Sequence, residues 1–416
     1  MRTKGRKGRK AQSSFCVVDP GTTTLRVLIV EVQSGGATVW GWAEAPAVAG
    51  SDLDIQPLAF AIDGALSQAE AMAQDRAGQW LMADQMVVGL PACQLQGWAP
   101  SVAQHRSQPE RPIDERELTG LLGRGLRLAV GQMSQPHAQA ATAKNRDSAA
   151  WRLLDSAVVA LTVDGHGVTD PVGFKGRDFG AVVYITLARL DAIDAWCKVA
   201  RRLEFSALTL TAAPLALAAG FPEPRVVLID VGGRTTDLIC CQAGRPVAID
   251  SLATGGSGLA RTLIQKWGIT PDKAEQLKRA YSGGRLTGEG AAQVKQLLAP
   301  AVQAWLTETE TALVRLNQDE PLPHRLVLLG GGSLVPDIAE ALRTLAWSQR
   351  LHFARYPEVG RLRPTDLPGV VNRTDLGRGG GDVTALALAA WAARQTGSPN
   401  RPARLMAELC RGEQRS

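Results

Sequence analysis

Short runs of apolar and β-branched residues, separated by turn residues, occur twice in the chain. The runs of the two copies lie at 15–18, 25–32, 38–42, 226–229, 238–242 and 247–251. Runs of this length bounded by Gly, Pro, Asp and Thr predict strands joined as an antiparallel meander. When the copies are aligned, Asp19 and Asp230 fall at matching places, where each first strand ends. We therefore predict an internal repeat, and such a repeat sets the architecture.

Helical periodicity fills most of the chain between these runs. At about 56–75, the apolar residues Leu58, Ile62, Leu66 and Ala69 fall on one stripe, which predicts an amphipathic helix. Further helices are predicted at about 189–203, 208–220 (beginning near Pro214), 258–267, 271–281, 289–315, 336–345 and 382–394. Alternation of strands with helices indicates an α/β protein.

A separate block of strands with one helix is predicted at about 86–187. It opens with an apolar run at 86–89, contains a helix that begins at Asp114, and closes with strands near 156–163 and 181–187.

The charge of the chain is concentrated at its start. The 416 residues include 46 Lys and Arg against 40 Asp and Glu, and the first ten residues hold six of the basic ones and no acid. The rest of the chain is therefore balanced, which argues against a nucleic-acid-binding face outside the N-terminal arm. No sequence-specific nucleic-acid contact is predicted, and residues 1–13 are predicted to be disordered.

Cysteine spacing and hydropathy bear on the compartment. Six cysteines occur with no C-x-x-C pair and no metal-ligand spacing, as expected of buried thiols in a reducing compartment. No apolar run approaches the roughly 18 residues that a membrane span needs. We predict a cytoplasmic protein.

Three glycine-rich turns each follow an apolar strand, at 19–24, 230–237 and 330–333. Glycine lets a phosphate chain approach backbone N–H donors, and threonine hydroxyls add further donors. A carboxylate at the end of each leading strand suits a hydrated Mg²⁺. Any one turn alone reads as an ordinary tight turn. The three together are more specific, and neither a P-loop nor a G-x-G-x-x-G motif competes with them.

These turns resemble the two phosphate motifs and the adenosine motif of the superfamily of actin, sugar kinases and heat-shock chaperone ATPases. Within it, the chain is most similar to the FtsA family of bacterial cell-division proteins, over about 15–395. The segments that carry this likeness are 163–165 with Val168, 170–174 with Gly176, Gly255–Gly256, 269–271 and 274–278. The PilM family of pilus-assembly proteins, which has the same insert, is a close alternative.

The resemblance implies an actin-like two-lobed α/β ATPase fold with a duplicated meander and helix core and an inserted SHS2-type subdomain. The expected divisions are a disordered basic arm at 1–13, lobe I at 14–85 and 188–224, the insert at 86–187, lobe II at 225–375 with a small nucleotide-contacting subdomain at about 257–324, a helix returning to lobe I at 376–396, and a linker and tail at 397–416.

The resemblance also implies the ligands, ATP and Mg²⁺. Asp19 and Asp230 would hold the metal through water, with Asp230 also in the network around the attacking water. The residues expected to contact nucleotide are Gly21, Thr22, Thr23, Gly232, Gly233, Thr235, Gly255, Glu275, Lys278, Gly331, Gly332 and Ser333. Among these, Glu275 and Lys278 would reach the ribose and base.

Three residues depart from the family pattern. Ala213 stands before Pro214, where relatives commonly place Glu or Gln to orient the attacking water. Arg234 replaces a usual glycine, and Pro20 removes one N–H donor from the first turn. We therefore expect nucleotide binding with slow or absent hydrolysis, which leaves open whether the protein is an enzyme.

The expected role is a cell-division scaffold that self-associates into filaments and links a tubulin-like polymer to the inner face of the membrane. The alternatives are a PilM-like pilus adaptor and a small-molecule kinase of the superfamily. The segment 401–411 has too small an apolar face to anchor firmly in lipid. Two routes to the membrane stay open, namely the basic arm and a partner protein.

Overall fold

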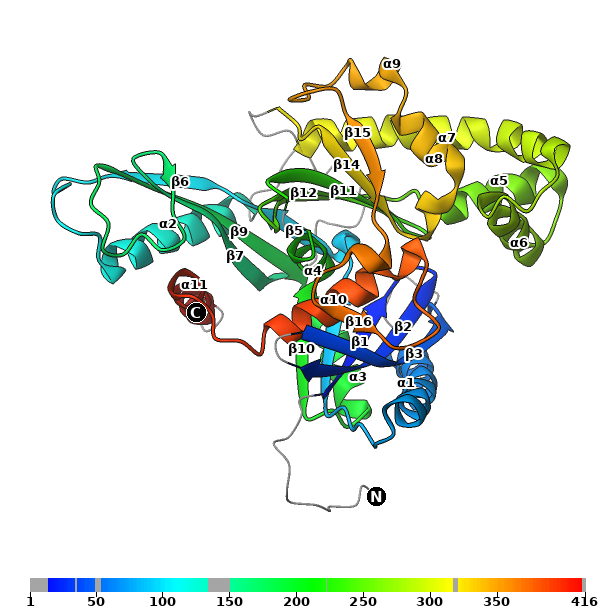
Figure 1. Ribbon diagram of the computed structural model, residues 1–416, viewed down its shortest axis with the longest axis horizontal. Helices are drawn as coiled ribbons and strands as arrows, with labels where there is room; N and C mark the ends of the chain where they lie inside the picture. Colours follow the sequence, from blue (N-terminus) through cyan, green and yellow to red (C-terminus); the bar gives the residue numbers. More distant parts are fainter. Residues whose placement is uncertain are drawn as a thin grey trace.

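The computed structural model describes residues 14–33, 36–48, 54–133, 150–221, 223–316 and 321–413. The arm predicted at 1–13 lies outside these residues. Two sheets with their helices lie one above the other, and the insert projects to one side of them (Figure 1). No helix in the described ranges is both long and apolar enough to span a bilayer.

The first sheet has the strand order β10-β4-β1-β2-β3-β16. Its strands are β1 (Ser14–Pro20), β2 (Thr24–Gln33), β3 (Gly36–Pro46), β4 (Gln85–Leu90), β10 (Ala207–Ala212) and β16 (Val370–Asn372). The meander predicted from the first copy is confirmed as β1–β3, paired antiparallel. Strands β4 and β10 run parallel to β1, so their carboxyl ends meet at one edge.

Helices cover both faces of this sheet. On one face lie α1 (Ile55–Ala77) and α3 (Leu190–Arg202), with the predicted stripe of α1 buried. On the other face lie α4 (Ala213–Ala219) and α10 (Val383–Arg394), and α10 is buried along nearly its whole length. Helix α10 carries apolar residues, most of them small, on every face. It therefore suits a position between the two sheets.

The second sheet repeats the pattern with β11 (Arg225–Val231), β12 (Thr236–Gln242) and β13 (Arg245–Leu252), paired antiparallel. Strand β14 (Arg325–Leu329) runs parallel to β11, as β4 does to β1, and β15 (Glu358–Arg361) follows at the edge. The internal repeat predicted from the sequence is thus present in the sheet topology.

Five more helices complete this half. They are α5 (Gly256–Trp267), α6 (Pro271–Ser282), α7 (Gly288–Leu316), α8 (Pro336–Leu342) and α9 (Leu345–Ser348). Short 3-10 turns lie at Ala92–Gln94, Gly331–Leu334, Pro364–Asp366 and Gly380–Asp382. Helix α7 packs along α5, α8 and β13, and its buried residues form one core with the sheet.

The insert consists of β5 (Leu95–Trp98), β6 (Ser101–His105), α2 (Glu115–Met133), β7 (Trp151–Val163), β8 (His166–Gly167) and β9 (Asp178–Arg189). Its strands extend the second sheet, because Trp98 of β5 pairs with Ala248 of β13. In the sequence, the insert follows strand β4 of the first sheet. In space, its strands join the edge of the second sheet.

Two domain boundaries and one helix predicted from sequence need correction. Residues 86–90 belong to β4 of the first sheet, not to the insert, because they pair with β1 and β10. Residues 370–372, assigned to lobe II, pair with β3 of the first sheet. In the range 208–220, predicted as a helix beginning near Pro214, the residues up to Ala212 form strand β10, since the alternating Leu and Thr residues pair with β4. The helix itself, α4, begins at Ala213, as predicted. The other domain boundaries stay predictions.

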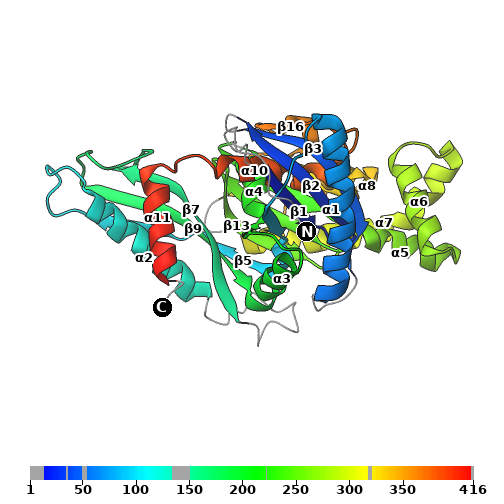
Figure 2. The same ribbon diagram turned by 90° about the horizontal axis from the view of Figure 1, so that it is seen from below.

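The C-terminal helix α11 (Arg401–Glu413) lies against the insert (Figure 2). Leu405, Met406 and Cys410 are buried in the core formed by α2, β7 and β9. Arg401 and Arg404 reach Glu115 at the start of α2, at 3.7 and 3.2 Å. The apolar face that the sequence shows at 401–411 is thus covered within the molecule.

Asp155 on β7 connects the insert to the first sheet. Its Oδ2 accepts hydrogen bonds from the Ala212 backbone N–H (2.6 Å) and the Thr211 hydroxyl (3.0 Å). Burial raises the pKa of Asp155 to about 6, and the two hydrogen bonds oppose this rise only in part. The next residue, Ser156, contacts Cys410 of α11 at 3.1 Å.

The pKa of Asp155 predicts a pH dependence of stability. The unfolded chain releases this proton near pH 4, whereas the folded chain holds it up to about pH 6. As pH rises through this window, we expect Asp155 to lower the free energy of unfolding by up to about 1.4 kcal/mol per pH unit. Urea denaturation at several pH values between 4 and 6 gives the free energy of unfolding as a function of pH. In Asp155→Asn this free energy should fall less steeply with rising pH than it does in wild type. The exposed Asp63→Asn variant should keep the wild-type slope, and an unchanged slope in Asp155→Asn would contradict the prediction.

Candidate functional site

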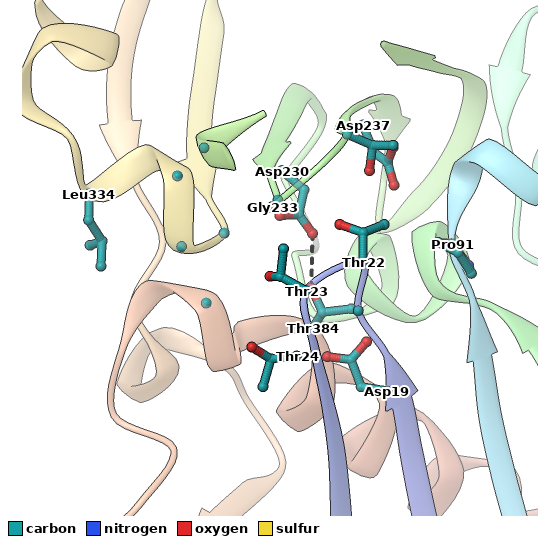
Figure 3. Close-up of a pocket in the computed structure, with 18 of the residues that line it drawn as sticks. Asp19, Thr22, Thr23, Thr24, Pro91, Asp230, Gly233, Asp237, Leu334 and Thr384 are labelled. Atoms are coloured by element: carbon teal, nitrogen blue, oxygen red, sulfur yellow. Dashed lines mark hydrogen bonds between the residues drawn. The ribbon is translucent and has the colours of Figure 1, made fainter. Parts of the chain in front are cut away.

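A cleft of about 790 Å³ opens between the two sheets. Its walls are the turns after β1, β11 and β14 and the starts of α4, α5 and α10, with one side of α6. Strands β1, β4, β10, β11 and β14 all end at this cleft, which is the usual place for a ligand in an open α/β sheet. Figure 3 shows the two hairpin turns facing each other across it.

The tips of the two hairpins touch. The backbone N–H of Arg234 donates to the Thr22 hydroxyl at 2.9 Å. A side chain at Gly233 would collide with Thr23, so this close approach requires glycine. The hairpins therefore form one continuous rim. Within it, the Arg234 N–H is already hydrogen-bonded to the protein itself.

Three aspartates line the cleft, namely Asp19, Asp230 and Asp237 (Figure 3). Burial raises the pKa of Asp19 to about 6, although Arg26 beside it has the opposite effect. Burial raises the pKa of Asp237 to about 7, although a hydrogen bond from Ser251 lowers this pKa in part. Burial also raises the pKa of Asp230, whose Oδ2 accepts a hydrogen bond from the Thr384 hydroxyl at 3.0 Å. The floor of the cleft thus concentrates acidic groups that little water reaches.

Arg26 on β2 is the basic group among these acids. Its guanidinium lies 3.7 Å from Asp19 and 2.9 Å from Asp382 at the start of α10. In the strand pairing, Arg26 stands opposite Asp19 as Asp237 stands opposite Asp230. The two copies of the repeat thus place opposite charges at the same position.

The third turn forms a flat backbone wall. Gly330 has φ +83°, and a side chain there would collide with Asp230. Gly331 borders the cleft, and a Cβ built on it would meet no protein atom within 4 Å. Across from it on α6, Lys278 Nζ pairs with Glu275 at 2.7 Å and donates to the Gly256 carbonyl at 3.1 Å.

Comparisons with known proteins address the fold. No family model matches the chain. The cell division protein FtsA of Neisseria meningitidis serogroup B is 23% identical over 215 residues, which are 45% of this chain and about half (52%) of that protein. The solved PilM-PilN type IV pilus biogenesis complex is similar with a TM-score of 0.59 and 16% identity, covering 93% of this chain and all of that one. The chain has the actin-like ATPase fold.

A further solved structure, the ethanolamine utilization protein EutJ from Carboxydothermus hydrogenoformans, is similar at a TM-score of 0.49 and 14% identity. This similarity covers 92% of each chain.

The actin-like cleft brings together most of the residues singled out from the sequence. Those that line it are Asp19, Gly21, Thr22, Thr23, Asp230, Gly232, Gly233, Thr235, Glu275, Lys278, Gly331 and Gly332. Two are not on the wall. Ser333 is buried and its hydroxyl donates to the Gly330 carbonyl, while Gly255 packs against the backbone of the second hairpin. The roles assigned to all of these residues stay predictions.

Several lining residues were not singled out from the sequence as ligand contacts. They are Arg26, Asp237, Gly256, Ser257, Arg279, Leu334, Arg361 and Thr384. The repeat contained the signal for Arg26 and Asp237, because each follows the aligned aspartate by the same number of residues. Thr384 carries no such signal, since α10 reaches the cleft only through the tertiary fold.

Replacing Arg26 tests the charge balance of the actin-like cleft. In Arg26→Met, Asp19 and Asp382 lose their ion pairs while staying largely buried, so we expect a loss of about 2–4 kcal/mol in the free energy of unfolding. Urea denaturation without added metal measures this. In the control Arg76→Met, which breaks a pair with the exposed Asp375, the loss should stay under about 1 kcal/mol. Equal losses in the two variants would contradict the prediction.

Proposed function

We propose that this protein binds Mg²⁺ and ATP in the cleft and acts as a nucleotide-dependent scaffold in cell division. The observation that supports the proposal is that Asp19 and Asp230, far apart in the chain, line one cleft beneath two facing hairpins. Cell division is proposed as the setting because the chain is similar to FtsA, a likeness that covers about half of that protein's length.

The residues present fit a nucleoside triphosphate. Phosphates would lie against the hairpins, where glycines and threonine hydroxyls border the cleft. The open space beside Gly331 leaves room for a flat base and sugar against backbone. On α6, Glu275 and Lys278 face the same space and are proposed to reach the ribose and base.

The carboxylates fit a divalent cation. Buried acids with raised pKa values gain most from a positive charge, because it favours the ionised form that burial disfavours. We assign Asp19 and Asp230 to hold Mg²⁺ through its water ligands. Bound Mg²⁺ would supply charge neutralisation of the phosphates.

Nucleotide binding would act on the shape of the molecule. One hairpin belongs to each sheet, so a phosphate chain held by both gains contacts only when the cleft is closed. A closed cleft would set which faces meet a neighbouring copy. We propose self-association into filaments, a tubulin-like division protein as partner, and a place at the inner face of the membrane.

A pilus-assembly adaptor is the second candidate function. It is favoured by the PilM-PilN complex, whose PilM-like fold spans nearly the whole of this chain. In this alternative the SHS2-type insert would bind a short peptide of a partner rather than another copy. Assembly on nucleotide addition, seen by light scattering, supports the first function. Stoichiometric capture of a pilus-partner peptide without assembly supports the second.

A substitution at Gly331 tests nucleotide binding. Because a Cβ there points into open space, we expect Gly331→Leu to fold normally and to weaken Mg-ATP binding by about tenfold or more through steric occlusion. Isothermal calorimetry gives the affinity, and thermal unfolding checks the fold. The matched control is Gly288→Leu, which also meets no neighbour but lies outside the cleft. Wild-type affinity in Gly331→Leu would argue against the proposed pose.

A substitution at Ala213 tests the expectation of slow hydrolysis. Ala213 begins α4 at the cleft wall and carries no polar atom that could orient water. We expect low single-turnover ATPase activity in wild type and an increase of about tenfold or more in Ala213→Gln, since an orienting group typically contributes that much. Adding Asp230→Ala should abolish the gain. Fast wild-type turnover would overturn the expectation.

A further inference from the structure

The entry turn of α10 (residues 379–384) is hydrogen-bonded to the second sheet at the cleft. The Thr384 hydroxyl donates to Oδ2 of Asp230, near the end of β11, at 3.0 Å (Figure 3). The Gly330 N–H, in the turn after β14, donates to the Gly380 carbonyl at 3.0 Å. The body of α10, by contrast, packs on β1, β2 and β3 of the first sheet. The entry turn therefore connects the two sheets beside the cleft.

The hydrogen bond from Thr384 fixes the direction of the Asp230 carboxylate. An aspartate side chain has broad freedom at its terminal torsion, so a carboxylate without partners samples many orientations. In Asp230, Oδ2 is held by the Thr384 hydroxyl, and Oδ1 occupies space that a side chain at Gly330 would need. Asp230 thus has one preferred orientation before any ligand arrives.

On the side of the first sheet, the same entry turn holds Arg26. The Arg26 Nε donates to Oδ1 of Asp382 at 2.9 Å, and Oδ2 of Asp382 accepts the Gly379 N–H at 2.8 Å. The contact between Arg26 and Asp19 is longer, at 3.7 Å. Asp382 therefore competes with Asp19 for the guanidinium, which leaves part of the Asp19 charge for another cation.

We propose that the entry turn of α10 positions the two carboxylates that are proposed to hold Mg²⁺. Thr384 orients Asp230 from across the cleft. Asp382 keeps Arg26 from neutralising Asp19. Ligands that surrounding hydrogen bonds hold in place bind a metal more tightly than mobile ligands do, because less freedom is lost on binding. The inference rests on the proposed function, since it concerns the same two carboxylates.

Calorimetric titration of ATP with excess Mg²⁺ and with EDTA tests the role of Thr384. The ratio of the two affinities measures what the cation contributes to binding. We expect Thr384→Val, which removes the hydroxyl at nearly constant size, to weaken ATP binding about tenfold or more with Mg²⁺ and less than about twofold with EDTA. Thr384→Ser keeps the hydroxyl and should bind as wild type does in both conditions.

A matched control lies just beyond the other end of α10. Thr396→Val removes a hydroxyl that donates to the Ala393 carbonyl at 2.8 Å outside the cleft, and should leave both affinities unchanged. Thermal unfolding shows whether each variant is folded. The proposal is overturned if Thr384→Val keeps wild-type affinity with Mg²⁺. It is also overturned if the affinity falls by the same factor with EDTA, as a purely structural role would cause.

Asp382→Asn tests the second effect in the same two conditions. Without the Asp382 charge, Arg26 can pair more closely with Asp19, so ATP binding should weaken several-fold with Mg²⁺ and should not weaken with EDTA. The control Asp375→Asn removes an exposed acid that pairs with Arg76, and should change neither affinity. Unchanged affinity with Mg²⁺ in Asp382→Asn, or equal weakening in both conditions, would overturn the role of Asp382.

Titration of Mn²⁺ alone separates this inference from the proposed function. Mn²⁺ prefers the same oxygen ligands as Mg²⁺. If wild type binds no ATP but binds Mn²⁺ about tenfold more tightly than Thr384→Val does, only the proposed function fails. If wild type binds neither ATP nor Mn²⁺, both fail.

Discussion

Placing Asp19, Asp230 and Asp237 together in one cleft, with Asp19 buried and the other two partly buried, is the constraint on which this structure depends. An ionised carboxylate loses hydration free energy when it is buried, and the raised pKa values of all three acids express that cost. Arg26 offsets it for Asp19, and hydrogen bonds from Thr384 and Ser251 offset it for the other two. Packing elsewhere in the fold therefore has to offset the rest of this cost.

The duplicated meander is the part of the fold that the sequence predicts best. Alternating apolar runs and glycine turns depend on local chemistry, so they mark β1–β3 and β11–β13 and align Asp19 with Asp230. Because each aspartate ends the first strand of its meander, the repeat also indicates that the two turns face a shared space. Most of the glycines and threonines singled out from the sequence line the cleft for this reason.

Features that depend on distant pairing were missed. The segment 207–212 has a composition that suits either a helix or a strand, and pairing with β4 decides between them. The run at 86–89 looks like the start of a new block until its pairing with β1 is known. The single pair between Trp98 and Ala248, which joins the insert to the second sheet, leaves no mark in the sequence. Thr384 reaches the cleft, and Asp382 reaches Arg26, only through the path of the chain into α10.

Neighbouring residues of β7 hold two different parts of the molecule. Asp155 holds the backbone just before α4, whose first residues form the cleft wall, while Ser156 touches the C-terminal helix. The two attachments lie one residue apart, so a single strand joins the C-terminal helix to the cleft wall beside Ala213.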